Sequence, residues 1–145
     1  MVNVAMLSFW HVHAPGYARE VQNHPDARVT VVWDEDPERG RSWAERLGVP
    51  FEPDLVKAVN RDDVDGVVVD APTNRHAEVI VTALEAGKHV FTEKVVAPTV
   101  AEVDRIGEAL SRANTQFVVS FPQRGRGGVK FAKKAVDEGL LGRVT

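Results

Sequence analysis

The chain has 145 residues, of which 43% are hydrophobic and 27% charged, and this composition is typical of a globular domain rather than a disordered or fibrous chain. No apolar run approaches the roughly 20 residues of a membrane span, and cysteine is absent, which excludes disulfides and thiolate metal sites, so we expect a cytoplasmic protein with no membrane partner. The net charge is −3, divided into −7 over residues 1–120 and +4 over residues 121–145, and such an acidic body argues against nucleic acid as a partner.

The first half of the chain alternates apolar β-rich runs with helical patterns. In order, these predict a strand over 2–7, a helix over 15–23, a strand over 27–33, a helix from Pro37 to Gly48, a brief helix over 53–60 and a strand over 65–71. Asp36 is the expected N-cap of the second helix and Gly48 its expected stop. The strand over 65–71 is almost entirely apolar, which is typical of a parallel sheet covered on both faces.

The second half continues the alternation. It predicts a helix over 74–87, a strand over 88–94, a helix over 99–114, a strand over 115–121 and a last helix over 127–139. Thr99 and Glu102 have the spacing of a capping box. The fold class is therefore α/β, with a doubly wound, mostly parallel Rossmann-type sheet and helices on both faces. Ligands of such sheets bind beyond the carboxyl ends of the strands, where the loops carry polar residues.

Asp34 ends the second predicted strand, 21 residues after His13. An acidic residue at such a strand end accepts the ribose hydroxyls of adenosine and repels a 2′-phosphate. The pattern favours NAD, with NADP as the alternative because Arg39 can pair with a phosphate. A second interpretation makes Asp34 a turn or capping residue.

Two further loops carry candidate residues. Pro72, Thr73 and Asn74 form a stiff polar turn after a strand, although Thr73 or Asn74 can equally cap the next helix, and a lone histidine at 76 is commonly a packing residue. Glu93 and Lys94 follow the next strand, where the lysine can donate to a substrate hydroxyl or the cofactor ribose. The alternative is an exposed ion pair.

The segment "HVH" at residues 11–13 raises the question of a metal. Two histidines are too few ligands, and no carboxylate or cysteine pattern completes a site, so we predict none.

Four motifs, "DPER" after Asp34, "PTNRHAE", "AGKHVFTEK" and "GLLGRV", occur in one order and spacing. With them, all 145 residues resemble the N-terminal region of the glucose–fructose oxidoreductase/inositol 2-dehydrogenase (Gfo/Idh/MocA) family. The resemblance implies a dinucleotide-binding Rossmann domain over 1–122 and a truncated start of a second, substrate-binding and oligomerisation domain over 123–145. It also implies an oxidoreductase that uses NAD or NADP to move hydride to or from a sugar, inositol or related polyol, and a homo-oligomer when the second domain is present.

The resemblance assigns roles by position. Lys94 corresponds to the lysine of a Glu-Lys-Pro signature that touches substrate and nicotinamide ribose, which makes it the expected catalytic residue, although Val95 replaces the proline. Arg124 matches an arginine near the nicotinamide end. The full set expected to bind the cofactor is Ser8, Trp10, His11, Asp34, Arg39, Pro72, Thr73, Asn74, His76, Glu93, Lys94 and Arg124.

The loop over residues 8–13 departs from the family pattern. Its glycine-spaced positions are Ser8, Trp10 and His13, and Trp10 stands where backbone normally approaches the pyrophosphate. The start of the following helix still offers free N–H groups and its dipole, so we expect phosphate binding to be weakened rather than lost. Alternatively, Trp10 or His11 shapes the nicotinamide pocket.

Three functions stay open on these residues. The first is the cofactor domain of a dehydrogenase that is active as a longer protein, in which case this chain alone binds NAD weakly and turns nothing over. The second is a non-catalytic Rossmann module that senses a nucleotide or sugar or binds a partner. The third is another adenosine-dependent reaction such as methyl transfer, for which Glu93 and Lys94 have no evident task.

Overall fold

A computed structural model describes residues 1–143; Val144 and Thr145, which end the segment expected to start a second domain, lie outside the described residues. The centre is a five-stranded sheet in the order β2-β1-β3-β4-β5, and every neighbouring pair is parallel. The strands are β1 (Val2–Leu7), β2 (Ala27–Trp33), β3 (Gly66–Val69), β4 (His89–Thr92) and β5 (Phe117–Val119). A single parallel bridge between Val32 and Phe51 adds a rudimentary strand outside β2. With it, the order becomes that of the doubly wound dinucleotide-binding fold.

The connecting helices confirm the predicted alternation. They are α1 (Ala14–Asn23), α2 (Pro37–Leu47), α3 (Leu55–Val59), α4 (His76–Glu85), α5 (Val100–Arg112) and α6 (Gly127–Asp137). Two 3₁₀ turns, η1 (Thr73–Arg75) and η2 (Pro122–Gly125), precede α4 and α6. The helix expected from residue 74 thus begins at His76. None of the helices within residues 1–143 is long and apolar enough to cross a membrane.

Local capping chemistry fixes the helix ends. The Asp36 side chain accepts the backbone N–H groups of Glu38 and Arg39 at the start of α2. Gly48 ends this helix in the left-handed conformation, at φ 69°. At α5, Thr99 and Glu102 form the reciprocal capping box that their spacing predicts.

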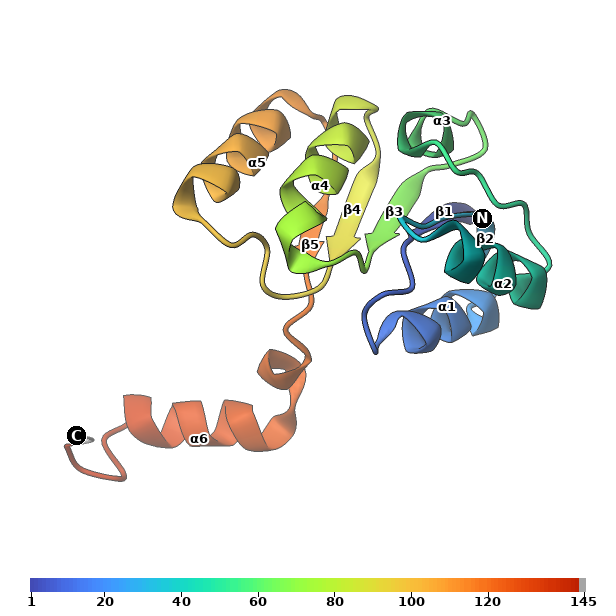
Figure 1. Ribbon diagram of the computed structural model, residues 1–145. Coiled ribbons are helices and arrows are strands. Elements are labelled where there is room, and N and C mark those ends of the chain that lie inside the picture. The colour runs from blue at the N-terminus through green and yellow to red at the C-terminus, as the bar shows by residue number, and fades with distance from the viewer. Residues whose placement is uncertain (144–145) are drawn as a thin grey trace.

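The helices cover both faces of the sheet, as predicted (Figure 1). One buried cluster joins Leu7 and Val69 of the strands to side chains of α3, α4 and α5, such as Ile80 and Ile106. A second cluster, on the other face, joins Met6 to α1 and α2. Because successive residues of a strand face opposite sides, Met6 and Leu7 belong to different clusters. The sheet is therefore buried on both sides, and its loops are left to carry function.

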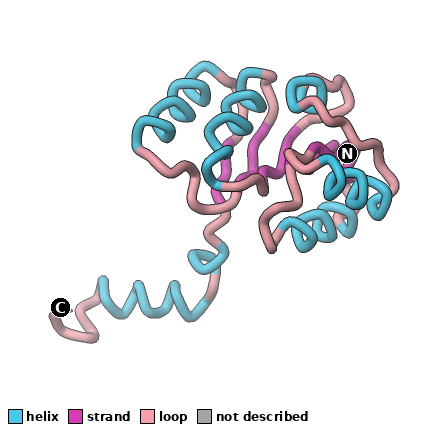
Figure 2. The backbone as a smooth tube through the Cα atoms, viewed as in Figure 1, coloured by secondary structure: helices cyan, strands magenta, loops and turns pink. Residues whose placement is uncertain are grey.

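The C-terminal helix α6 stands apart from this body. In Figures 1 and 2 it extends from the end of β5 on a short connection. Only Ala135 of α6 is buried, whereas the apolar side chain of Phe131 is 71% exposed. Helix α6 therefore has little packing surface within the described residues. The boundary between residues 122 and 123 stays a prediction.

Candidate functional site

The loops that follow β1, β2, β3 and β4 meet at the carboxyl edge of the sheet. The loop over residues 8–13, here called the β1–α1 loop, contacts all three others. The Phe9 N–H donates to Asp34 Oδ2 (2.8 Å), the His11 N–H donates to the Asp70 carbonyl (3.0 Å), and His13 Nδ1 lies 2.6 Å from Glu93 Oε1. The structure thus brings four of the predicted ligand-binding loops into one site. Ligands of open α/β sheets bind at this position.

The β1–α1 loop keeps the shape of the glycine turn without its glycines. Ser8, at the first glycine-spaced position, is buried and has a φ of 81°, in the left-handed region that glycine normally fills. Phe9 is buried and stacks on Trp43 of α2, with ring centroids 4.4 Å apart. Trp10 is 51% exposed. The chain therefore turns sharply at Ser8, is anchored at Phe9 and presents Trp10 to solvent.

The backbone donors of this loop are largely occupied by the protein itself. Side-chain and backbone acceptors from Asp34, Ser8, Asp70 and His11 take the N–H groups of Phe9, Trp10, His11, His13 and Ala14. Pro15 has no N–H, and the His13 carbonyl accepts the N–H groups of Gly16 and Tyr17. Among the described hydrogen bonds, this leaves the N–H of Val12 as the loop donor without a partner. The expectation of several free N–H groups at the start of α1 is therefore wrong, because the carbonyls of His11 and His13 accept them.

Asp34 lies at the end of β2, is 2% exposed and is held by four hydrogen bonds. Two come from the Arg39 guanidinium, with Nε 3.0 Å from Oδ2 and Nη2 2.6 Å from Oδ1. Arg39 also pairs with Glu35 and Asp36. Burial lowers the pKa of Arg39, but the hydrogen bond and charge of Asp34, with the other two carboxylates, raise the pKa above its usual value. The Asp34 side chain thus stabilises the turn after β2, which was one of the two interpretations of this residue from the sequence. Three carboxylates, those of Asp34, Glu35 and Asp36, share the single Arg39 guanidinium here.

In the segment that follows β3, residues 72–76, His76 has a structural role. Thr73 begins η1, and neither Thr73 nor Asn74 makes a side-chain cap to η1 or α4. The capping interpretation of these two residues is therefore wrong, because the 3₁₀ turn intervenes. His76 is buried, and its ring nitrogens lie 2.8 Å from the Val95 carbonyl and 2.9 Å from the Ala71 carbonyl. His76 thus ties the end of β3 to the loop after β4, as a packing residue does.

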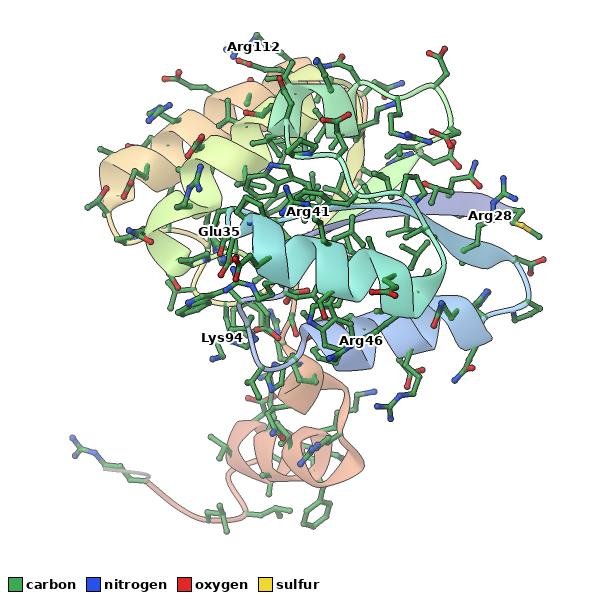
Figure 3. All side chains as sticks on the ribbon, turned by 45° about the vertical axis from the view of Figure 1, so that its right-hand side comes forward. Arg28, Glu35, Arg41, Arg46, Lys94 and Arg112 are labelled. Carbon is green, nitrogen blue, oxygen red and sulfur yellow. The ribbon has the colours of Figure 1, made fainter. Side chains whose placement is uncertain are left out.

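Glu93 is the most connected side chain of the site. It is 1% exposed; its Oε1 accepts the Tyr17 hydroxyl and faces His13 Nδ1, and its Oε2 accepts the Lys94 N–H (3.0 Å). Burial raises the pKa of Glu93, but hydrogen bonds from Tyr17 and His13 outweigh it, so the pKa lies below its usual value. The alternative of an exposed Glu93–Lys94 ion pair is wrong. Lys94 is exposed at the surface, as Figure 3 shows.

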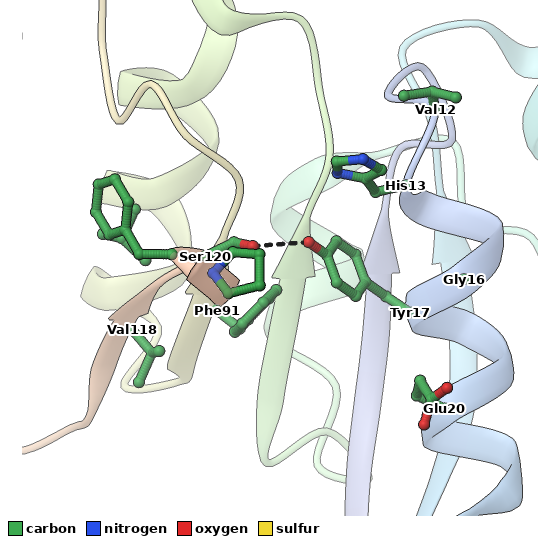
Figure 4. A pocket seen from close by; sticks show the side chains of 11 residues that line it. Val12, His13, Gly16, Tyr17, Glu20, Phe91, Val118 and Ser120 are labelled. Atoms are coloured by element: carbon green, nitrogen blue, oxygen red, sulfur yellow. Dashed lines mark hydrogen bonds between the residues drawn. The ribbon is translucent and has the colours of Figure 1, made fainter. Parts of the chain in front are cut away.

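Three residues of this site, Tyr17, Ser120 and Asp70, had no role in the sequence-based prediction. Tyr17 lies one helical turn after His13, and its hydroxyl contacts both Glu93 and Ser120 Oγ, the latter at 2.8 Å (Figure 4). Burial and the hydrogen bond to Glu93 raise the pKa of Tyr17 to about 12. Its i, i+4 spacing from His13 was the available signal.

Asp70, which lies directly after β3, is the third residue of the site without a sequence-based role. Its side chain is fully buried, and neither carboxylate oxygen has a hydrogen-bond partner within residues 1–143. Burial, with the charge of Glu93, raises the pKa of Asp70 to about 8. A polar residue at the end of an apolar strand was the available signal.

His11 and His13 converge with Glu93. A nitrogen of each ring and one oxygen of the carboxylate all lie within 4.8 Å of one another. Burial lowers the pKa of His11, so its imidazole is neutral near pH 7. The sequence-based argument that no carboxylate accompanies the two histidines is therefore wrong, because the carboxylate comes from a strand end 80 residues away.

A hollow of about 680 Å³ lies beside these residues, between α1 and the ends of β4 and β5 (Figure 4). Tyr17 and Ser120 separate it from Glu93, and Phe91 and Val118 give it an apolar floor. Arg124 lies further along, in η2, exposed and without a hydrogen bond from its side chain among the described residues. The structure therefore does not join Arg124 to the other predicted residues.

The strand order and the acidic end of β2 define a dinucleotide-binding domain of the doubly wound class. A family model described as "Oxidoreductase family, NAD-binding Rossmann fold" (GFO_IDH_MocA) matches residues 9–121, and the chain belongs to this family.

Curated relatives agree. The chain is 37% identical over 117 residues to inositol 2-dehydrogenase 3 of Saccharopolyspora erythraea, covering 80% of this chain and 35% of the relative. It is 31% identical over 128 residues to myo-inositol 2-dehydrogenase of Thermotoga maritima, covering 88% and 38%. A scyllo-inositol dehydrogenase of Lactobacillus casei, solved with NAD(H) and scyllo-inositol, superposes with a TM-score of 0.84 at 26% identity, covering 100% of this chain and 43% of that one. The chain spans about a third of the length of the curated relatives it matches.

Proposed function

We propose that the chain binds NAD at the carboxyl edge of its sheet and is the cofactor domain of an enzyme that oxidises or reduces a hydroxyl of a sugar, inositol or related polyol. The inositol dehydrogenases among its relatives support this substrate class. A cytoplasmic location, and a homo-oligomer formed through the family's second domain, belong to the same proposal. The activity is that of a longer protein, and we expect the 145-residue chain to turn nothing over.

The observation that carries the proposal is the acidic end of β2. Asp34, Glu35 and Asp36 share the single Arg39, so this end of the cofactor site keeps a negative charge. Carboxylates at this position accept ribose hydroxyls and repel a 2′-phosphate, which favours NAD over NADP. Glu35 Oε2 is buried without a hydrogen-bond partner within the described residues, so it is an acceptor ready for a hydroxyl donor. The residues present therefore fit the adenosine end of NAD.

The diphosphate end fits less well. Because the β1–α1 loop has bonded most of its own N–H groups, a diphosphate finds the Val12 N–H and the α1 dipole in place of a glycine cradle. We therefore expect weaker binding than a complete glycine-rich loop gives. This same feature favours the second candidate, a non-catalytic module.

Lys94 is the proposed catalytic residue. It follows β4 at the sheet edge and its ammonium is exposed, so it can donate a hydrogen bond to a substrate hydroxyl. A bound NAD would supply the hydride acceptor for the carbon that carries this hydroxyl. The hydroxyl proton leaves to a base, which we expect in the family's second domain. Lys94 thereby positions the hydroxyl and stabilises charge on its oxygen as the proton departs.

The test is a titration of the pure chain with NADH and then NADPH, followed by quenching of tryptophan emission and transfer to the nicotinamide. A Trp10→Phe variant shows how much of the signal is local. We expect saturable quenching that is stronger for NADH than for NADPH. Absence of a saturable signal up to millimolar cofactor would refute dinucleotide binding by this chain and favour the module.

A matched pair of variants tests the charge argument. Glu35→Gln removes one carboxylate from the acidic end, whereas Glu45→Gln removes one from an exposed position further along α2. Glu35→Gln should lower the ratio of the NADPH to the NADH dissociation constant about tenfold, whereas Glu45→Gln should leave this ratio unchanged. An equal effect of both variants would show that general charge, and not this site, sets the preference.

A further inference from the structure

The β1–α1 loop does more than replace a glycine turn. His11 and His13 are two residues apart in the loop, and their rings meet edge to face with centroids 4.7 Å apart. Glu93 reaches the same point from the end of β4. The three candidate ligand atoms lie within 4.8 Å of one another. Ligands around a tetrahedral zinc ion stand roughly 3.3 Å apart, given zinc–nitrogen distances of about 2.0–2.1 Å, so only a small side-chain adjustment is needed.

The side chains leave room for that adjustment. The His13 side chain is 52% exposed, so its ring can turn without disturbing the core. Glu93 is buried and held by Tyr17, and the N–H of His13 donates to His11 Nδ1 (3.2 Å), which orients the His11 ring. The Tyr17 hydroxyl is a partner of the kind that fixes a ligating carboxylate and raises metal affinity. The His13 N–H bond to His11 Nδ1 is given up when the His11 ring takes a metal, because that nitrogen then either binds the ion or carries the ring proton. One fixed carboxylate and two adjustable imidazoles thus face a common point.

The charge of the site provides a second, independent observation. Glu93 and Asp70 are both buried carboxyl groups of this edge, and within residues 1–143 neither forms a salt bridge with a lysine or arginine side chain. The side chain that faces Glu93 is the His13 imidazole, and both oxygens of Asp70 are without a hydrogen-bond partner among the described residues. Buried carboxylates are usually paired with a cation or bound to a metal. Among the described residues Glu93 has no lysine or arginine side chain beside it, and a metal ion would supply the missing positive charge.

We propose that His11, His13 and Glu93 bind one divalent transition-metal ion of the zinc class. Two imidazole nitrogens and one carboxylate oxygen suit such ions, whereas magnesium and calcium prefer oxygen ligands alone. Three protein ligands leave a fourth position open to water or to an oxygen of a ligand, as in catalytic rather than structural zinc sites. The ion takes the place between the His13 ring and the Glu93 carboxylate where their hydrogen bond now lies.

The experiment uses the untagged 145-residue chain, freed of metal with a chelator and without nicotinamide cofactor, so that it does not depend on the proposed function. Co²⁺ binding is followed by its visible absorption, and Zn²⁺ binding by calorimetry. We expect one ion per chain, with affinity reduced at least tenfold in His11→Ala, His13→Ala and Glu93→Gln. His24→Ala, which removes an exposed histidine outside the cluster, should bind as the parent does.

Two outcomes would overturn the assignment. One is binding that no cluster variant weakens more than His24→Ala does. The other is the absence of one-to-one binding in the parent chain. Because Glu93 is buried, circular dichroism and a melting curve are recorded for each variant. His13→Ala keeps the test decisive if Glu93→Gln does not fold, since the His13 side chain is half exposed.

Discussion

Asp70 is a buried carboxyl group that opposes folding at neutral pH. Neither of its oxygens has a hydrogen-bond partner within the described residues, and burial raises its pKa from 3.8 to about 8. We expect Asp70→Asn, which has nearly the same shape and cannot ionise, to raise the free energy of unfolding at neutral and alkaline pH. The reason is that the parent chain must bind a proton on Asp70 in order to fold at neutral pH, or bury its charge at higher pH, and the variant avoids both costs.

The magnitude follows from the difference between folded and unfolded pKa values. Between pH 4 and pH 8 the folded chain holds a proton on Asp70 that the unfolded chain releases, so stability falls as the pH rises across this window and levels off above it. At pH 7 the accumulated penalty is at most about 4 kcal/mol, at 1.36 kcal/mol per pKa unit. Near pH 4 the two forms should be about equally stable, since the carboxyl is then neutral in both states.

The assay is urea unfolding of the parent and Asp70→Asn at pH 5, 6, 7 and 8, followed by far-ultraviolet circular dichroism. Asp104→Asn on the exposed face of α5 is the control, and its effect should be small and constant with pH. The gain from Asp70→Asn should grow steadily with pH. If the variant is less stable than the parent at pH 8, or its gain does not change with pH, the buried-charge reasoning is wrong.

Four further substitutions probe packing beside the site and the capping and helix propensity of α5, each measured by urea unfolding. Gly40→Ala places a Cβ 2.3 Å from the Phe51 ring and should cost about 1–3 kcal/mol, whereas Gly107→Ala, with nothing within 4 Å, should stabilise α5 by up to about 1 kcal/mol; equal effects would contradict the close approach of α2. Thr99→Ala breaks the capping box and should cost about 1 kcal/mol, and no loss would mean that the cap is redundant. Phe9→Ala removes the anchor of the β1–α1 loop and should cost about 3–5 kcal/mol, and a loss below 1 kcal/mol would show that the anchor is dispensable.

The fold could be predicted because its signals are local. Asp36, Gly48 and the Thr99–Glu102 pair act within one helical turn, and the structure places each at the helix end that its spacing predicts. Of the apolar run over 65–71, the strand Gly66–Val69 is buried on both faces, as its composition predicts. The misplaced start of α4, at His76 rather than 74, arises where a 3₁₀ turn competes with the helix at a strand end.

For the candidate site, the sequence could predict which residues lie there but not which contacts they make. The sequence placed Asp34, His11 and Glu93 at one sheet edge, because the carboxyl ends of parallel strands meet there. It could not show which partners these side chains take. The Glu93 carboxylate pairs with the His13 side chain and not with the Lys94 ammonium, and Asp34 contacts the backbone of the β1–α1 loop as well as Arg39. The Glu93–His13 and Asp34–Phe9 contacts join residues 80 and 25 positions apart, which a local pattern does not encode.

The loss of glycine from the β1–α1 loop is best understood as an exchange of ligand chemistry. A decayed phosphate loop would leave its N–H groups free and its side chains without partners. Here Ser8 keeps the left-handed turn, the N–H groups are bonded internally, and His13 is joined to a buried carboxylate. A loop that has given up most of its anion donors and gained two imidazoles beside Glu93 is better suited to a cation than to a diphosphate. The NADH affinity of the chain therefore measures how much phosphate binding the β1–α1 loop has lost, and its metal affinity measures what the two imidazoles beside Glu93 provide instead.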